Sequence, residues 1–186
     1  MKRIFDLILA VFVTAILFIP MITIAIVIKL TSEGPILYWS DRVGQHNHIF
    51  KMPKFRSMKT DTPAVATHLL EDPKSVLTPI GDFLRKSSLD ELPQIWNILK
   101  GDMSFVGPRP ALYNQDDLIE LRTQQDIHKL LPGLTGWAQI NGRDELSIPD
   151  KVALDLAYKK KQSFCFDLKI LYLTFAKVLL KDGVTH

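Results

Sequence analysis

The sequence is poor in cysteine: Cys165 is the only one among 186 residues. A single cysteine excludes an internal disulfide framework and a zinc site built on cysteines. Because it lies in the apolar stretch SFCFDL, we expect it to be a small buried side chain. The two histidines of the GQHNH stretch also lack a common zinc-binding spacing, so this stretch predicts a polar turn.

The sequence also lacks the usual signatures of nucleotide and nucleic-acid binding. It contains neither the G-x-x-x-x-G-K-[ST] phosphate loop nor a dinucleotide fingerprint. A basic stripe with interleaved aromatic residues is missing too, which argues against a nucleic-acid partner. The net charge is only +3, but residues 1–60 hold eight Lys and Arg against three Asp and Glu. This basic surplus lies beside the most apolar segment, where it would favour an anionic membrane surface.

What the sequence does have is a long uncharged run of 22 residues, Leu7–Ile28. A helix of that length rises about 33 Å, enough to cross the hydrocarbon core of a bilayer. The run is too long for a cleaved signal peptide and is not followed by a small-residue cleavage site. A small domain also has little room for a helix that is apolar on every side. We therefore predict a membrane anchor over residues 1–30 and a second domain over residues 31–186.

The path of this anchor through the membrane has two readings. Pro20 lies inside the run, where it removes one backbone hydrogen bond and favours a kink or a break. Basic residues flank both ends, with Lys2 and Arg3 before the run and Lys29 after it. If basic flanks mark the cytoplasmic side, a re-entrant hairpin places both ends correctly and a kinked span places only one. The residues alone leave both readings open.

The remaining residues predict an α/β fold that is mainly helical. Two short extended runs on either side of GQHNH predict a β-hairpin, and the proline-rich residues 60–80 predict a loop. Helices are expected from about Pro93 to Gly101, from 114 to 131, from 148 to 158 and from 167 to 180. The last is amphipathic, so it is suited either to pack on the core or to lie on the membrane surface.

Two adjacent acids, Asp90 and Glu91, lie in the stretch SSLDELPQ where a helix is about to begin. The structural interpretation is helix capping, since Ser88 and Glu91 match the S-x-x-E capping box. The functional interpretation is a site, because carboxylates bind hard divalent metals and an aspartate can attack phosphorus. Both interpretations remain open on local sequence.

Basic residues near these acids favour the functional interpretation. Lys54 and Arg56 are two residues apart in a predicted strand, which would place both side chains on one face. Arg85 lies five residues before Asp90, and Arg109 is held between two prolines. An arginine on such a stiff segment is a pre-organised, bidentate ligand for phosphate. Together these residues predict a site that binds phosphate groups and a divalent metal.

The glycine-rich stretch LPGLTGWAQINGR, residues 131–143, is less specific. It is either a buried turn packed around Trp137 or a wall of a nucleotide or sugar pocket.

Several of these stretches together resemble a known family. They are GPILYWSDRVGQ, KFRSM, RKSSLDELPQIWNILKGDMSFVGPRP, LPGLTGWAQINGR and DLAYKKKQSFCFDLKIL. In this order they resemble the bacterial sugar transferases and, more narrowly, the small monotopic phosphoglycosyl transferases. The resemblance implies transfer of a sugar 1-phosphate from a UDP-sugar to undecaprenyl phosphate, with release of UMP and a requirement for Mg²⁺. It also implies a re-entrant anchor in the bacterial inner membrane and a catalytic domain at its cytoplasmic face.

The resemblance assigns a role to each matching position. Asp90 would be the nucleophile that forms a covalent phosphosugar intermediate and a ligand of the metal, and Glu91 its partner. Arg109 would hold phosphate, together with basic residues near the two acids and on the nucleotide side: Lys54, Arg85 and Arg143. One departure concerns the anchor, where Ile19 stands at the position before proline that is usually serine in the family.

Two rival functions follow from the same residues. A membrane-bound phosphohydrolase of nucleotide-sugars or polyprenyl phosphates would use water as the acceptor. A non-catalytic membrane-anchored partner of a glycan-assembly complex would use the two acids only as helix caps. The sequence leaves open which sugar is transferred, which glycan is built, and whether the chain forms a homodimer.

Overall fold

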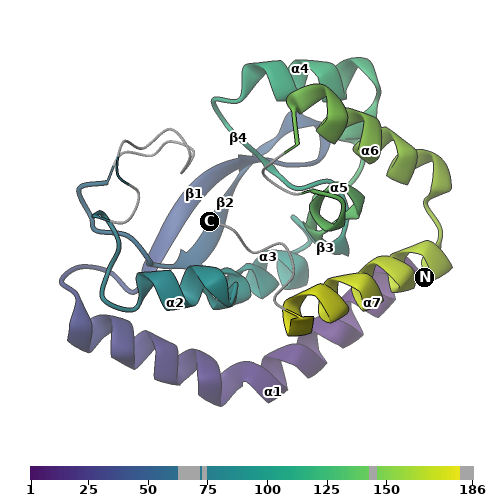
Figure 1. Cartoon of the computed structure of the whole chain (residues 1–186). Helices are drawn as coiled ribbons and strands as arrows, with labels where there is room; N and C mark the ends of the chain where they lie inside the picture. The colour runs from purple at the N-terminus through teal and green to yellow at the C-terminus, as the bar shows by residue number, and fades with distance from the viewer. Residues whose placement is uncertain (63–71, 73–74, 143–145, 181–186) are drawn as a thin grey trace.

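The computed structural model confirms a mainly helical α/β fold with a long apolar N-terminal helix (Figure 1). It describes residues 1–62, 72, 75–142 and 146–180. The longer helices are α1 (Lys2–Thr31), α4 (Asp116–Gln124), α6 (Ile148–Lys161) and α7 (Phe164–Leu180). Shorter ones are α2 (Gly81–Lys86), α3 (Ile95–Lys100) and α5 (Trp137–Ile140). The described residues also contain the 3₁₀ turns η1 (Gln45–Asn47), η3 (Leu89–Gln94) and η4 (Ile127–Lys129).

The strands form two small sheets. Strands β1 (Leu37–Val43) and β2 (Ile49–Phe55) make the expected antiparallel hairpin around the GQHNH turn. Strand β4 (Ala111–Leu112) pairs with the other edge of β1, which gives the order β2-β1-β4. Strands β3 (Ser104–Val106) and β5 (Gly133–Thr135) form a separate parallel pair. These pairings bring β1 and β5, which are distant in the chain, next to the segment between β3 and β4.

Helix α4 is shorter than the sequence predicted. The expected helix from 114 to 131 ends at Gln124, and Asp126 adopts a left-handed conformation with φ 57° before η4. An aspartate tolerates that conformation because its short side chain can hydrogen-bond locally. The helix ending near Gly101 is confirmed, with φ 105° at that glycine. Of the predicted loop over residues 60–80, residues 63–71 and 73–74 lie outside the described residues.

Helix α1 is exposed along most of its length. In its most apolar 18-residue window only 6% of the residues are buried, which is unlike a core helix of a soluble protein. Its outer side presents large apolar side chains to the surroundings, namely Val11, Phe12, Ile16, Phe18 and Ile19. In the described part of the chain, α1 alone is long and apolar enough to cross a membrane. Water would disfavour such a surface, whereas the hydrocarbon core of a membrane would accommodate it.

The backbone of α1 stays helical through Pro20, so the proline does not break the helix. Figure 1 shows that α1 is bent and that its convex side faces away from the other helices. A proline inside a helix causes such a bend, and the Thr23 hydroxyl, which donates to the Ile19 carbonyl at 3.0 Å, adds to it.

Both ends of α1 pack on the rest of the chain. Near its start, Ala10 is fully buried in the main core together with Ile98, Met103 and Ile170. Near its end, Ile28 is fully buried in a second cluster of apolar side chains, with Phe55 and Leu84. Figure 1 shows α2, α3 and α7 next to α1, with α4 and α6 farther away.

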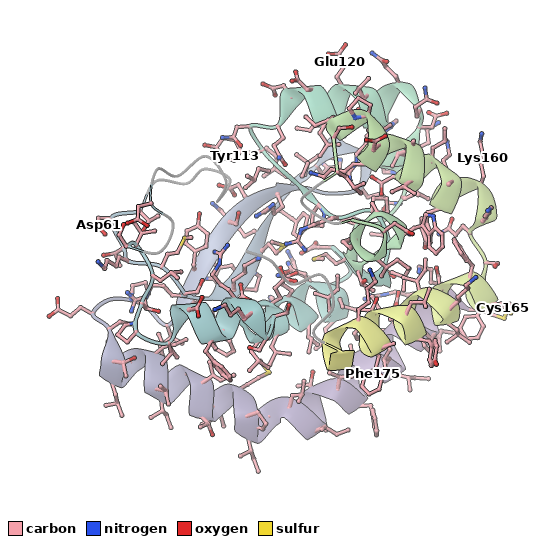
Figure 2. All side chains as sticks on the ribbon, in the orientation of Figure 1. Asp61, Tyr113, Glu120, Lys160, Cys165 and Phe175 are labelled. Atoms are coloured by element: carbon pink, nitrogen blue, oxygen red, sulfur yellow. The ribbon has the colours of Figure 1, made fainter. Side chains whose placement is uncertain are left out.

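The expectation that Cys165 is buried is wrong, because it is exposed in the first turn of α7. Asp167 and Ile170 face the core, with 4% and 0% exposure. A residue two positions before Asp167 is turned by about 200° around the helix axis and therefore points outward. Figure 2 shows Cys165 at the start of α7, at the edge of the molecule.

Candidate active site

Four of the predicted residues meet in one cluster of charges. Lys54, near the end of β2, places its Nζ 2.8 Å from Glu91 Oε1 and 3.9 Å from Asp90 Oδ2. Arg109, in the segment between β3 and β4, places its Nη2 2.8 Å from the same Glu91 oxygen. The two carboxylate side chains are 10% and 12% exposed, so water screens these interactions only weakly.

The capping interpretation of the two acids is wrong. Ser88 occupies the N-cap position of η3 in a left-handed conformation, φ 55°, and its side chain makes no capping hydrogen bond. The Glu91 amide instead donates to the Ser88 carbonyl at 3.2 Å. The Glu91 carboxylate points to Lys54 and Arg109, since two cations stabilise it more than one neutral backbone amide does.

The two acids differ in their acid strength. Burial raises the pKa of the Asp90 carboxyl above its ordinary value, and the nearby charge of Glu91 raises it further, against the lowering effect of Lys54. Burial acts in the same way on Glu91, but Arg109 and Lys54 together outweigh it and hold its pKa well below the ordinary range. Glu91 is therefore firmly ionised, whereas Asp90 is the more basic carboxylate of the pair.

The other predicted cations have separate positions. Arg85 lies in the last turn of α2, with its Nη1 3.9 Å from the sulfur of Met58, and its charge lowers the pKa of Asp90. Arg85 thus acts on the cluster electrostatically. Arg143 lies outside the described residues.

The expectation that Arg56 shares a face with Lys54 is wrong. Strand β2 ends at Phe55, so the alternation of faces ends one residue before Arg56. The Arg56 guanidinium is buried and donates to the carbonyl oxygens of Ser32, Glu33 and Pro35, just after α1. It holds the end of the anchor and takes no part in the charge cluster.

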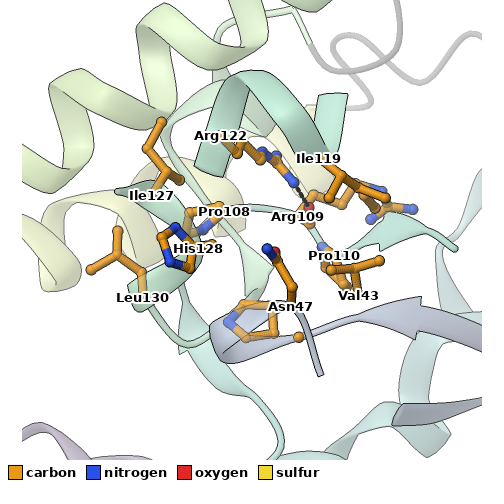
Figure 3. Close-up of a pocket in the computed structure, with 13 residues that line it drawn as sticks. Val43, Asn47, Pro108, Arg109, Pro110, Ile119, Arg122, Ile127, His128 and Leu130 are labelled. Carbon is orange, nitrogen blue, oxygen red and sulfur yellow. Dashed lines mark hydrogen bonds between the residues drawn. The ribbon is translucent and has the colours of Figure 1, made fainter. Parts of the chain in front are cut away.

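The segment Pro108–Pro110, which carries Arg109, is fixed through its backbone. Its three consecutive carbonyl oxygens accept hydrogen bonds from three distant places in the chain: the Gly133 amide at 2.9 Å, Arg122 Nη1 at 2.8 Å and Arg42 Nη1 at 3.3 Å. Figure 3 shows the bond from Arg122 to the Arg109 carbonyl. The direction of the Arg109 side chain is therefore set from β1, α4 and β5 together.

Arg122 is itself held by a buried ion pair. Its Nη2 lies 2.6 Å from Asp155 Oδ2 on α6, and the Asp155 residue is 1% exposed. Burial raises the pKa of Asp155, and the charge of Arg122 opposes this effect. Arg42, Arg122 and Asp155 could not be found from the sequence, because contacts between residues far apart in the chain leave no local residue pattern.

A shallow pocket lies on the side of the Pro108–Pro110 segment that faces Arg122 (Figure 3). Asn47 of the hairpin turn and His128 of η4 line it, together with Val43 and Ile119. This pocket does not include Asp90, Glu91 or Lys54, so it adjoins the back of the arginine-bearing segment.

The described part of the stretch 131–143 is a packed turn. Gly133 lies on β5 and Gly136 follows it, and a Cβ on either would come within 2.1 Å of a backbone atom of Gly107. Trp137 packs on Phe166, with 5.1 Å between the ring centroids. This close contact of backbones supports the interpretation of residues 131–142 as a buried turn. It also fixes Gly107, just before the Pro108–Pro110 segment.

The described residues contain no group of three His, Cys, Asp or Glu side chains that could enclose a metal ion. Glu91 is occupied by two cations, whereas the Asp90 carboxylate makes no hydrogen bond within the described residues. Magnesium in proteins commonly takes one or two carboxylates and completes its shell with water and substrate phosphates. Asp90 fits that donor set together with a bound diphosphate.

The fold and the site define a protein with a long, exposed apolar helix and two buried acids framed by basic side chains. The chain belongs to the bacterial sugar transferase family, whose model matches residues 1–181.

Three relatives show the breadth of this similarity. The uncharacterized sugar transferase EpsL of Bacillus subtilis is 42% identical over 99% of this chain and 90% of its own length. The UDP-glucose:undecaprenyl-phosphate glucose-1-phosphate transferase of Escherichia coli is 40% identical, over 95% of this chain and 40% of its own. The UDP-galactose-lipid carrier transferase of Erwinia amylovora is 36% identical, over 98% and 41%. The chain thus spans about two fifths of the two relatives whose names state a reaction.

Proposed function

We propose that this chain transfers a sugar 1-phosphate from a UDP-sugar to undecaprenyl phosphate and releases UMP, as the first membrane step of glycan assembly. Family membership and the reactions named for two relatives support the substrate classes. The observation that carries the mechanism is the unequal environment of the two acids. Glu91 is held by Lys54 and Arg109 at 2.8 Å each, while the more basic Asp90 carboxylate remains available to react.

In the first step, an Asp90 carboxylate oxygen attacks the phosphorus that is bonded to the sugar oxygen. A bond forms between this oxygen and phosphorus, and the bond from phosphorus to the bridging oxygen of the diphosphate breaks. UMP leaves with the electron pair of that bond, and the sugar phosphate stays on Asp90 as an acyl phosphate. Lys54 and Arg109 lie where they can bind the non-bridging oxygens, on which negative charge develops.

In the second step, a phosphate oxygen of undecaprenyl phosphate attacks the same phosphorus. The bond from phosphorus to Asp90 breaks and restores the carboxylate, so no proton has to be supplied to the leaving group. Glu91 keeps Lys54 and Arg109 in place through both steps, because it bonds both cations at one oxygen. A magnesium ion held by Asp90 and the diphosphate would neutralise phosphate charge as Asp90 approaches.

We further propose that α1 is re-entrant, with both ends and the catalytic residues on the cytoplasmic side of the inner membrane. Support comes from the packing of both ends of α1 on residues 31–186 and from the exposed apolar side chains between them. A helix that crossed the bilayer would place its two ends on opposite faces, and one domain could not bind both.

The order of the chemistry tests the proposed mechanism. Purified enzyme is mixed with Mg²⁺ and a UDP-sugar labelled in the sugar, without lipid, using a panel of UDP-sugars. We expect UMP in an amount limited by the enzyme, labelled sugar phosphate on the protein, and its discharge by undecaprenyl phosphate.

Asp90→Asn should abolish the adduct and leave the thermal unfolding temperature close to that of the wild type. If UMP formed only when both substrates were present, and no adduct accumulated on folded enzyme, direct transfer would replace this mechanism. Turnover that continues in water and does not respond to undecaprenyl phosphate would identify a phosphohydrolase.

Cysteine labelling tests the orientation of the anchor. In a Cys165→Ser background, which removes the exposed native thiol, single cysteines are placed before Met1 and at Glu33. A membrane-impermeant maleimide added to intact cells should label neither position, and both should react after the membrane is opened. Labelling of the first cysteine in intact cells would establish a kinked span and contradict the re-entrant helix.

A further inference from the structure

The start of α1, residues 2–6, contains three charged residues, Lys2, Arg3 and Asp6, directly before the apolar run. As a sequence pattern, the two basic residues mark only the cytoplasmic side of the membrane. In the structure all three side chains bond to segments of the chain that lead to the charge cluster. Asp6 is 2% exposed, although it lies at the edge of a membrane helix.

Arg3 holds the far end of α3, the helix that directly follows the turn with the two acids. Its guanidinium donates to the carbonyl oxygens of Ile98 and Leu99, in the last turn of α3, with Nη2 2.9 Å from the latter. These carbonyls have no partner inside the helix, and they carry the negative end of the helix dipole, so a fixed cation stabilises them. Since α3 continues directly from η3, the bond fixes one end of the segment whose other end carries Asp90.

The middle of α3 is tied to the strand that carries Lys54. Asn97 Nδ2 donates to the Lys51 carbonyl of β2 at 2.9 Å, and Asn97 is 1% exposed. The separation between Lys54 and the two acids therefore depends on how α3 lies against β2. Arg3 and Asn97 together determine that position.

Asp6 and Lys2 hold the strand that leads to Arg109. Asp6 Oδ1 accepts a hydrogen bond from the Phe105 amide at 3.3 Å, and Lys2 Nζ donates to the Val106 carbonyl at 3.0 Å. Lys2 also pairs with Asp167 of α7 at 2.5 Å. Strand β3 ends at Val106, three residues before Arg109.

We infer that the start of α1 is part of the architecture of the active site, with Arg3 and Asp6 as positioning residues for the two acids and for Arg109. The inference rests on the proposed function. At its other end the anchor is held by Arg56, two residues after Lys54. Every segment that contributes to the charge cluster is thus bonded to an end of α1 or to the residues just after it. The position of the anchor in the bilayer therefore sets the geometry of the cluster.

Lys29 provides a matched control for Arg3. It is the basic flank at the other end of α1, it is exposed, and within the described residues its side chain makes no hydrogen bond or ion pair. Removal of either positive charge weakens the basic flanks that mark the cytoplasmic side of the membrane. Only the removal of Arg3 releases α3.

The experiment compares Arg3→Ala, Arg3→Lys and Lys29→Ala, each reconstituted in vesicles of anionic and zwitterionic lipid. The amount of UMP released in the first turnover counts active enzyme, and kcat per active enzyme and KM for the UDP-sugar are then measured separately. We expect Arg3→Ala to lower kcat at least tenfold and to change KM less, because the two acids and Arg109 are displaced from the reacting phosphorus. Lys29→Ala should stay within twofold of the wild type.

Arg3→Lys keeps the charge but cannot reach both carbonyls with a planar fork, so we expect only part of the rate to return. If Arg3→Ala fails to insert into the membrane, Arg3→Lys still tests the contact with the two carbonyls, because it keeps the positive charge. Wild-type kcat in Arg3→Lys, or equal losses in Arg3→Ala and Lys29→Ala, would overturn the inference. A loss in the number of active molecules with an unchanged kcat would overturn it too, whereas a wild type that releases no UMP would reject the proposed function itself.

Discussion

The position of Lys54 between the two acids leads to a quantitative prediction. Lys54→Met removes the ammonium group and keeps most of the aliphatic side chain. Lys51→Met is the matched control, because Lys51 lies on the same strand but pairs with Asp41 at the surface, with 65% of its side chain exposed. We expect the first change to impair the reaction and the second to leave kcat/KM within twofold of the wild type.

The expected size follows from the 3.9 Å between Lys54 Nζ and Asp90 Oδ2. At an effective dielectric constant of about 20, two unit charges at this distance interact by about 4 kcal/mol. Arg85 and Arg109 remain and also stabilise the ionised form of Asp90, so we take about half of that energy as lost. A loss of about 2 kcal/mol corresponds to about a 30-fold decrease in kcat/KM.

The pH profile gives the sign of the effect. Asp90 must be ionised to attack, and Lys54 is the largest of the charges that lower its pKa. Without Lys54 the pKa of Asp90 rises, so the acid limb of the kcat/KM profile should move to higher pH. UMP release is measured from pH 5 to 9, and thermal unfolding checks that the variant is folded. An acid limb that moves to lower pH, or a rate within twofold of the wild type, would refute the electrostatic reasoning.

Three further predictions concern Arg109, Glu91 and the ion pair between Arg122 and Asp155. Arg109→Ala should lower kcat/KM at least tenfold with the fold intact, and Arg109→Lys should recover only part, because ammonium lacks the planar fork; wild-type kinetics would contradict phosphate binding. Folding lowers the pKa of Glu91, so its ionised form stabilises the protein at neutral pH, and this stabilisation is lost as the pH falls from the ordinary glutamate value through the depressed one. The excess of wild-type stability over Glu91→Gln in chemical denaturation should therefore shrink in acid, and an excess that grows in acid would contradict the ion pairs. Asp155→Asn should destabilise the protein by about 3 to 5 kcal/mol, because it leaves buried Arg122 unpaired; an unchanged unfolding temperature would show that the pair is dispensable.

Short-range signals explain what could be predicted from the sequence. Helix α6 begins at Ile148 as expected, because the Ser147 side chain accepts a hydrogen bond from the Asp150 amide. Gly101 ends α3 in a left-handed conformation, and the polar GQHNH turn joins two strands. Each of these features depends on residues that are close together in the chain, so the local pattern contains the needed information.

Long-range contacts explain the failures. Ser88 and Glu91 match the capping box in the local sequence. Lys54, which lies 37 residues before Glu91, supplies a stronger partner for the Glu91 carboxylate. The assignment of Arg56 to the face of Lys54 failed because the strand ends one residue too early. The sequence correctly grouped four charged residues that the structure brings together, yet it contained no sign of the ion pair between Arg122 and Asp155 that supports them.

The contacts of the start of α1 have a consequence for biosynthesis. Lys2 is made 165 residues before its partner Asp167, and Arg3 and Asp6 are made about 100 residues before their partners. The apolar run can enter the lipid long before any of these partners exist. The anchor can therefore reach its native position only after α7 has begun to form, and until then a nascent chain holds an inserted helix whose charged start is still exposed to water. Such distant contacts make this final closure a slow event in folding compared with the formation of the helices themselves.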